Sequence, residues 1–198
     1  LIEEAVRLLR YSLESHVVGS FRCTDGTQWG HTWISSLGVE RMMHGVEAVM
    51  PYVSANEGDL LREMLISESD WLLDNYEIVA DPDATTGKNK PESNLWNGAV
   101  MHRTAMMYPD APRADEYREK GTRFLVNSIS VPSDATMEKI LDGRPVSEWF
   151  VGPQFFETYA LHHHCYLNVG YMVICLSNAA MLHLGYRTWN QEPPASAP

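Results

Sequence analysis

The chain has 198 residues, 44% of them apolar, which is enough to bury the core of one domain and argues against disorder over most of its length. Its formal net charge is −11, with only 15 lysines and arginines, so we do not expect it to bind nucleic acid phosphates. No apolar run approaches the roughly 20 residues of a membrane span, and the three cysteines show no CxxC spacing, so we expect neither a membrane segment nor a cysteine motif.

Helical spacing of apolar residues dominates the first part of the chain. Apolar residues three and four apart predict helices over residues 1–17 and 31–53, separated by a loop with the turn signal Asp25-Gly26. Ser54 is a candidate N-cap for a third helix over 55–76, and Glu57 completes the pattern of a capping box.

The second part of the chain alternates helices with long loops. Residues 80–92 are predicted to be a loop, and the next helix begins near Ser93. A fifth helix is predicted over 114–130. A second long loop follows, with a possible hairpin turn at Asp142-Gly143, and the last helix is predicted over 166–184.

These elements predict an all-α fold of antiparallel helix hairpins, because no convincing alternating strand is present. We expect residues 1–186 to form this helical domain and residues 187–198 to form a tail or linker. The first residues already read as the middle of a helix, so we expect the chain to be part of a longer protein. Long polar loops of such an array gather at one end, where function usually lies.

Three loop-to-helix junctions share one composition: "TDGTQWGHTW", "NKPESNLWNG" and "ETYALHHHCYLNVGY". Each brings Trp or Tyr together with Asn, His or Glu just before a helix. Aromatic faces cover the apolar faces of a sugar ring and polar tips hold its hydroxyls. Helix N-termini also favour anions, which suits the carboxylate of a uronic acid.

Each candidate residue also has a purely structural interpretation. Asn94 could simply cap a helix, Trp96 could belong to the core, and Trp29 and His31 could pack within their loop. Within the triple histidine, a metal site made of His162, His164 and Glu157 is conceivable. Its spacing matches no strong motif such as HExxH, so we predict no metal and no cofactor.

Tyr, His and Asn together are the residue types that β-elimination from a uronic acid polymer requires. Asn or His stabilises the carboxylate as an enolate-like intermediate forms, and Tyr or His moves the protons. A glycoside hydrolase would instead use two carboxyl groups, for which Glu92, Glu148 and Glu157 are loop candidates. A helical scaffold or carbohydrate-binding module without catalysis is the third alternative.

Two segments, 87–130 and 148–183, together resemble the helical part of bacterial heparinase II/III-like proteins, and "WGHTWISSLGVERM" resembles an earlier hairpin of the same part. The resemblance implies an incomplete (α/α) toroid, of which this chain is about half, normally followed by β-sandwich domains. It also implies an acidic polysaccharide or oligosaccharide as partner, cleavage by a lyase, and a periplasmic or secreted location.

The resemblance further implies a set of site residues. Asn97 or Asn94 would neutralise the uronate carboxylate, His164 would act as neutraliser or base, and Tyr166 as base and acid. Cys165 stands where relatives are expected to have Gly, which places the local loop geometry in question because Cys does not relieve a positive φ. The complete prediction is that catalysis uses Asn97, His164 and Tyr166, and substrate binding uses Asn94, Trp96, Trp29, His31, His163, Trp149 and Glu157.

Overall fold

The computed structural model describes residues 1–81 and 84–197, and over these residues the fold is all-α. The α-helices are α1 (Ile2–Glu14), α2 (Ser35–Val49), α3 (Ala55–Asn75), α4 (Pro91–Met107), α5 (Ala114–Val126), α6 (Val146–Trp149) and α7 (Val169–Thr188). Two short 3-10 helices, η1 (Met50–Tyr52) and η2 (Pro132–Thr136), follow α2 and α5. Part of the loop predicted over 80–92 lies outside the described residues.

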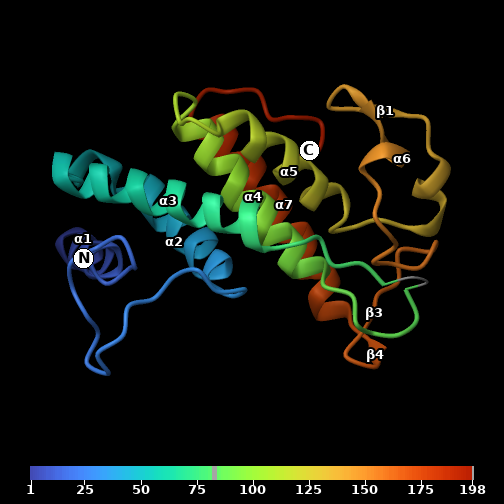
Figure 1. Cartoon of the computed structure of the whole chain (residues 1–198), viewed down its shortest axis with the longest axis horizontal. Helices are drawn as coiled ribbons and strands as arrows, with labels where there is room; N and C mark the ends of the chain where they lie inside the picture. Colours follow the sequence, from blue (N-terminus) through green and yellow to red (C-terminus); the bar gives the residue numbers. More distant parts are fainter. Residues whose placement is uncertain (82–83, 198) are drawn as a thin grey trace.

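Helix α4 lies at the centre of the molecule. It packs against α2, α3, α5 and α7, which surround it (Figure 1). Every residue from Pro91 to Met106 is buried, although the segment contains Asn, His, Arg and Glu as well as apolar side chains. A helix that is covered all round needs internal partners for its polar side chains, so their hydrogen bonds identify what each part of α4 does.

Several local predictions are confirmed. Ser54 Oγ accepts a hydrogen bond from the Glu57 N–H, and the Glu57 side chain accepts one from the Ser54 N–H, which completes the capping box at the start of α3. In α5, the inward-facing residues Tyr117, Phe124 and Leu125 are buried. These signals are short-range, so the sequence alone determines them.

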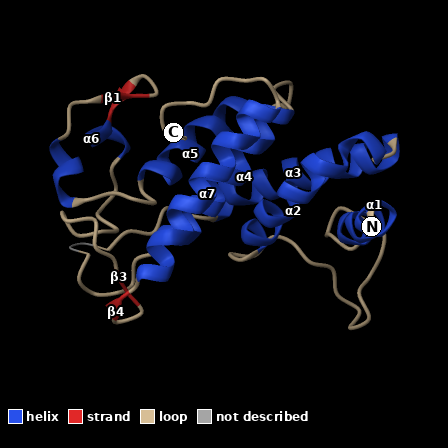
Figure 2. Cartoon of the chain, turned by 180° about the vertical axis from the view of Figure 1, so that it is seen from behind, coloured by secondary structure: helices blue, strands red, loops and turns tan. Residues whose placement is uncertain are grey.

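Two antiparallel hairpins interrupt the helices, and both lie between α5 and α7 (Figure 2). The first joins β1 (Ile140–Leu141) to β2 (Arg144–Pro145) through the expected Asp142-Gly143 turn. The second joins β3 (His162–His163) to β4 (Tyr166–Leu167). Because Tyr166 pairs with His163 across this hairpin, α7 begins at Val169 and not at Tyr166 as predicted.

The last residues of the chain return to the helical body. Gln191 Nε2 donates to the carbonyl of Met106, and the N–H groups of Ala195 and Ser196 donate to the Asp142 carboxylate. Ala197 is buried. Residues 189–197 therefore pack on the end of α4 and on the β1–β2 turn.

A buried charge cluster joins α2, α4 and α7. Arg103 is fully buried and donates to Glu40 through Nε and Nη2, at 2.8 and 3.1 Å, and to Glu47 through Nη1 at 2.6 Å. Nη2 also donates to the carbonyl of Met181 in α7. The carboxylates raise the pKa of Arg103 against the opposing effect of burial, so the guanidinium stays charged.

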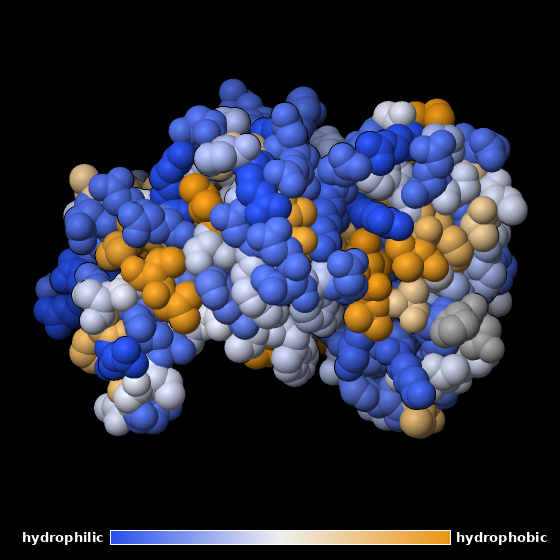
Figure 3. All heavy atoms as spheres, viewed as in Figure 1, coloured by the Kyte–Doolittle hydropathy of each residue, from blue (hydrophilic) through white to orange (hydrophobic). Residues whose placement is uncertain are grey.

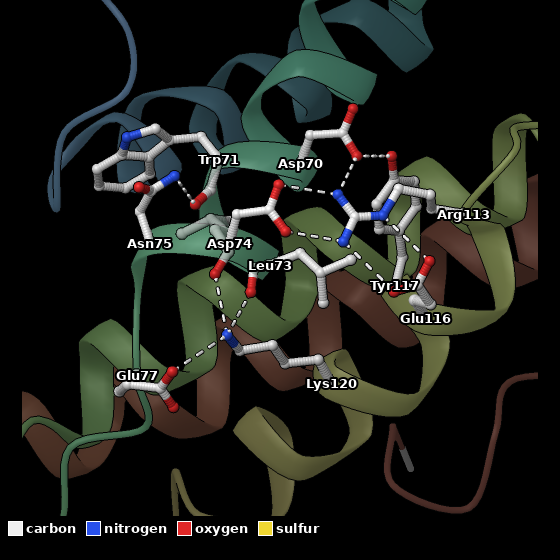
Figure 4. Close-up of polar contacts among 11 residues, drawn as sticks. Asp70, Trp71, Leu73, Asp74, Asn75, Glu77, Arg113, Glu116, Tyr117 and Lys120 are labelled. Carbon is white, nitrogen blue, oxygen red and sulfur yellow. Dashed lines mark hydrogen bonds and ion pairs between the residues drawn. The ribbon is translucent and has the colours of Figure 1, made fainter.

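A second, more exposed polar network joins α3 to α5 (Figure 4). The Arg113 guanidinium donates to both oxygens of Asp74 at 2.9 and 2.8 Å, and also reaches Asp70 and Glu116. Lys120 Nζ donates to the carbonyls of Leu72 and Leu73 near the end of α3. The ammonium group therefore caps the end of α3, where the Leu72 carbonyl also accepts from the Tyr76 N–H.

Helix α7 is long and apolar enough to cross a membrane by length and composition alone, a test that core helices of soluble proteins also pass. Cys175, Asn178 and Leu182 lie on its buried side. Its other side is exposed and carries the aliphatic side chains of Val169, Val173, Leu176 and Leu184. Over the face seen in Figure 3 the surface is mostly hydrophilic, with separate apolar patches.

Candidate functional site

The second and third aromatic and polar junctions of the sequence contact each other, and the start of α2, just after the first junction, contacts the second. His163 of the third junction donates from Nδ1 to Asn89 Oδ1 of the second, at 3.0 Å. Ser36, just after the first junction, donates from Oγ to Asn97 Oδ1 at 2.7 Å. The β3–β4 hairpin lies at the lower right of Figure 1, whereas α2 and α4 lie near its centre. The second and third junctions are therefore in contact, whereas Trp29 and His31 of the first junction pack against His16 and Trp71.

The β3–β4 hairpin presents the triple histidine. His162 and His163 form β3, while His164 and Cys165 form a two-residue turn with φ values of 54° and 68°. Both turn residues thus occupy the left-handed region that Gly or Asn normally fills in such hairpins. Cys165 adopts the positive φ that the expected Gly would tolerate without strain, so the turn stores backbone strain of about 1 kcal/mol for each residue.

His163 is the buried centre of this hairpin. Its ring centroid lies 3.9 Å from that of His164 and 4.6 Å from that of Tyr171. Asn89 is fixed by donating from Nδ2 to the Gln154 carbonyl, so its Oδ1 faces the His163 ring. The Nδ1 proton of His163 is therefore fixed, and Nε2 carries the lone pair.

A carboxyl group faces that lone pair. His163 Nε2 and Glu92 Oε2 are 3.7 Å apart, beyond hydrogen-bond distance, and within the part of the chain that the structure describes neither atom has a hydrogen-bond partner. Burial raises the pKa of Glu92 and lowers the pKa of His163 to about 4. Burial thus disfavours the charged form of both groups and keeps the imidazole neutral.

Two tyrosines and a lysine complete the surroundings. Burial raises the pKa of Tyr171, and the nearby Glu92 and Tyr166 add to the effect, so its phenol keeps its proton at neutral pH. Tyr166 and His164 are exposed, with Tyr166 showing 58% of its surface. The positive charge of Lys90 lowers the pKa of both Glu92 and His163, because it disfavours protonation of each. Lys90 thus places a positive charge close to both groups.

The first half of α4 carries an unusual concentration of unsatisfied polar atoms. Glu92 Oε2, Ser93 Oγ, Trp96 Nε1 and Asn97 Nδ2 are buried and have no hydrogen-bond partner among the described residues. Their spacing places all four on one side of the helix. Buried polar groups in native proteins are almost always paired, so such a cluster requires an explanation such as a catalytic role or a bound molecule.

The structure distinguishes the two asparagines that the sequence left as alternatives. Asn94 is fully used, because Oδ1 accepts from the Val79 N–H and Nδ2 donates to the carbonyls of Val79 and Asn127. Among the described residues, Asn97 only accepts a hydrogen bond, from Ser36, and its Nδ2 donor has no partner. Asn97 is also fully buried, so contact with a substrate requires movement of the side chains that cover it.

The predicted aromatic platforms all have packing roles in this structure. Trp149 is buried, donates from Nε1 to the Leu141 carbonyl and lies under the Arg144 guanidinium. Trp29 is half-buried and donates from Nε1 to the Ser12 carbonyl. Trp96 is buried, and its Nε1 is one of the four unsatisfied atoms of α4. Among the three tryptophans it is therefore the platform candidate that belongs to this cluster.

The remaining two predicted residues lie apart from His163. Glu157, a hydrolase candidate, is anchored by the N–H and Oγ of Ser133. His31 lines a groove of about 690 Å³ along α3, together with Trp71 and Asp70. His31 thus belongs to a second polar cluster, which continues to Glu68 and His16.

Sequence reasoning gave no site role to Asn89 and Lys90, counted Tyr171 only among the tyrosines of the type needed for β-elimination, and considered Glu92 only for a hydrolase. Asn89 and Lys90 lie in the loop before α4, and the turn that brings His163 to them carries no Gly or Asn signal. Tyr166 and Tyr171, which flank the end of the hairpin in the sequence, were the available signal for a site there.

Comparison of the chain with protein-family models, with curated proteins and with solved structures finds no match in any of the three.

Proposed function

We propose that this chain is a lyase-like helical domain that binds acidic polysaccharide and cleaves uronate-containing glycans by β-elimination. The observation that carries the proposal is the cluster of unsatisfied buried polar atoms on α4, directly beside a hairpin that exposes His164 and Tyr166. The resemblance to heparinase II/III-like proteins supports it and adds that the helices belong to an incomplete (α/α) toroid.

The proposed chemistry assigns a task to each group. Lys90 and the unused Nδ2 donor of Asn97 stabilise the substrate carboxylate as negative charge develops on it. His164 removes the proton on the carbon next to that carboxylate, the electron pair forms a carbon–carbon double bond, and the bond to the glycosidic oxygen breaks. Tyr166 gives its proton to the leaving oxygen.

His163, which is buried beneath the hairpin, supports the proton transfer by His164 without touching the substrate. His163 contacts the ring of His164, and burial disfavours a charge on it. An uncharged neighbour leaves His164 free to accept a proton, because a second positive charge at 3.9 Å would oppose it. Asn89 holds the orientation of His163 through its hydrogen bond to Nδ1.

The test is an assay for the unsaturated product, which absorbs in the ultraviolet, with heparin, alginate, chondroitin and ulvan as substrates. We expect one of them to be cleaved, and we expect His164→Ala and Tyr166→Phe each to reduce the rate by about a hundredfold or more. Tyr159→Phe is the matched control, since Tyr159 is also an exposed tyrosine but lies outside the β3–β4 hairpin, in which Tyr166 pairs with His163.

Three outcomes contradict the proposal. New reducing ends without unsaturation indicate a hydrolase, and binding without turnover indicates a carbohydrate-binding module. Full activity of the His164→Ala and Tyr166→Phe variants removes the assigned roles even if a glycan is cleaved.

A further inference from the structure

A second cluster of chemically capable side chains lies beside α3. It consists of His16, His31 and Glu68, which are distant in the sequence. Each offers one ligand atom, and these atoms all lie within 4.8 Å of one another. His16 and Glu68 are fully buried, while His31 is partly exposed and lines the groove of about 690 Å³.

We propose that His16, His31 and Glu68 bind a divalent transition-metal ion, for which Zn²⁺ is the best match. Two imidazoles and one carboxylate, with a water as fourth ligand, form a known type of zinc site. Ligand atoms at about 2.0–2.2 Å from a tetrahedral ion are separated from one another by roughly 3.3 Å. The distance of 2.8 Å between His16 Nε2 and Glu68 Oε1 therefore has to open by about half an ångström to admit the ion.

Outer contacts already hold the three ligands in place. Glu68 Oε2 accepts from Ser35 Oγ at 2.6 Å, and Oε1 accepts from the His31 N–H at 2.7 Å. The His31 ring is stacked on Trp71, with 5° between the planes. Such second-shell contacts orient ligands and are a regular part of protein metal sites.

Gly30 lets the loop close over the cluster. It has a φ of 121°, and a Cβ added there would lie 2.4 Å from His16 Nε2 and 2.9 Å from Glu68 Oε1. Any side chain at this position would occupy the space between the ligand atoms. The sequence Trp29-Gly30-His31 thus delivers a ligand and leaves room for it at the same time.

Metal binding at this cluster requires no external base to remove a proton. Glu68 accepts hydrogen bonds from His16, from Ser35 Oγ and from the His31 N–H, which are the contacts that an ionised carboxylate, the form that binds metal, makes. In the metal-free chain, His16 donates from Nε2 to Glu68 and accepts from the Val18 N–H at 3.3 Å through Nδ1. Metal binding at Nε2 moves that proton to Nδ1, at the expense of the long contact from Val18.

The groove gives the ion a route of access, because His31 contributes to its wall. The inference does not depend on the proposed lyase function, since none of its three ligands takes part in the assigned chemistry. A metal here ties the loop after α1 to the middle of α3, and water in the groove supplies the fourth ligand.

The experiment uses the full chain after treatment with a chelator and its removal. Zn²⁺ is titrated by calorimetry, and Co²⁺ is added to a second sample to record the visible bands of tetrahedral cobalt. We expect one equivalent of either ion to bind. His31→Ala and Glu68→Gln should weaken binding at least tenfold and remove the cobalt bands, while His44→Ala, a histidine outside the cluster, should leave both unchanged.

His31→Ala decides the outcome if Glu68→Gln fails to fold, because the His31 side chain is partly exposed and its loss is tolerated more easily. Far-ultraviolet circular dichroism confirms that each variant is folded. The proposal is overturned if the wild-type chain binds no equivalent of Zn²⁺ or Co²⁺, or if folded His31→Ala binds them as tightly as the wild type. Either result would leave the cluster as a hydrogen-bonded network that needs no ion.

Discussion

The two halves of α4 are equally buried but differ in how their polar groups are satisfied. In the second half, Arg103 reaches two carboxylates and a carbonyl, and His102 has Tyr186 and Thr122 as partners of its two ring nitrogens. In the first half, Glu92 and Asn97 each retain a buried polar atom without a partner among the described residues.

This difference separates stability from function within one helix. A buried polar atom that lacks a partner costs about 1–3 kcal/mol relative to a satisfied one. The second half avoids that cost and joins α2, α5 and α7. The first half bears the cost at several adjacent positions, which is typical of a site prepared for a ligand or for proton transfer.

The largest expected effect is in the satisfied half. Arg103→Met leaves Glu40 buried without its cation, so we expect the free energy of unfolding to fall by about 3–5 kcal/mol. Urea denaturation followed by circular dichroism measures this. Arg118→Met, on the more exposed surface of α5, should cost less than about 1 kcal/mol. Equal effects of the two substitutions would show that the buried cluster is not a structural centre.

Asn94 and Asn97 allow the cost of satisfied and unsatisfied polar groups to be compared within the first half of α4. Asn94→Ala removes three hydrogen bonds, and we expect a loss of about 2–3 kcal/mol. Asn97→Ala removes one and should cost only about 1 kcal/mol, yet it should abolish most lyase activity. The same denaturation assay, combined with the product assay, checks both. An inactive Asn94→Ala variant with unchanged stability would reverse the assignment.

Two buried histidines make the free energy of unfolding depend on pH. His102 and His163 each have a pKa of about 4 in the folded chain against an ordinary value of 6.5, because burial disfavours the charged ring. The unfolded chain therefore binds more protons between these values. Each histidine contributes stability that is complete above pH 6.5 and is lost as the pH falls toward 4.

We expect each of these histidines to account for a loss of about 1–2 kcal/mol between pH 7 and pH 5. His102→Gln and His163→Gln should each flatten the dependence of unfolding free energy on pH in that window, and the double variant should flatten it further. A pH profile identical to that of the wild type in His163→Gln would show that this ring is not held neutral by burial.

The smallest expected effect concerns the strained turn. Cys165→Gly places at φ 68° the residue that adopts this conformation without a steric penalty, so we expect a gain of about 1 kcal/mol, partly offset by the greater freedom of the unfolded chain. Thermal denaturation measures it. A matched substitution at Cys175, which lies within α7, should destabilise instead. A destabilised Cys165→Gly variant would mean that the thiol side chain contributes more than the turn costs.

The sequence predicts the parts of this fold that depend on neighbouring residues. The Ser54–Glu57 capping box and the Asp142-Gly143 turn are local signals, and both are present. The start of α7 was predicted three residues early because a turn built from His164 and Cys165 carries no usual turn residue. Local propensity does not reveal a conformation that tertiary contacts impose.

The candidate site was predictable only in outline. Composition showed that aromatic and polar residues occur at three junctions, and the structure brings the second and third into contact while the first lies with His16 and Glu68. The separate roles of Asn94 and Asn97 could not be predicted, because each depends on partners more than 14 positions away, such as Val79 and Ser36. The cluster of His16, His31 and Glu68 has no compact spacing, so no short motif announces it.

Ser35 and Ser36 are consecutive residues at the start of α2, yet they serve different neighbours. The first hydroxyl donates to Glu68 and the second to Asn97. One peptide unit therefore connects the histidine–carboxylate cluster to the proposed carboxylate-binding amide. A shift of that first helical turn would therefore alter the contacts of both centres at once.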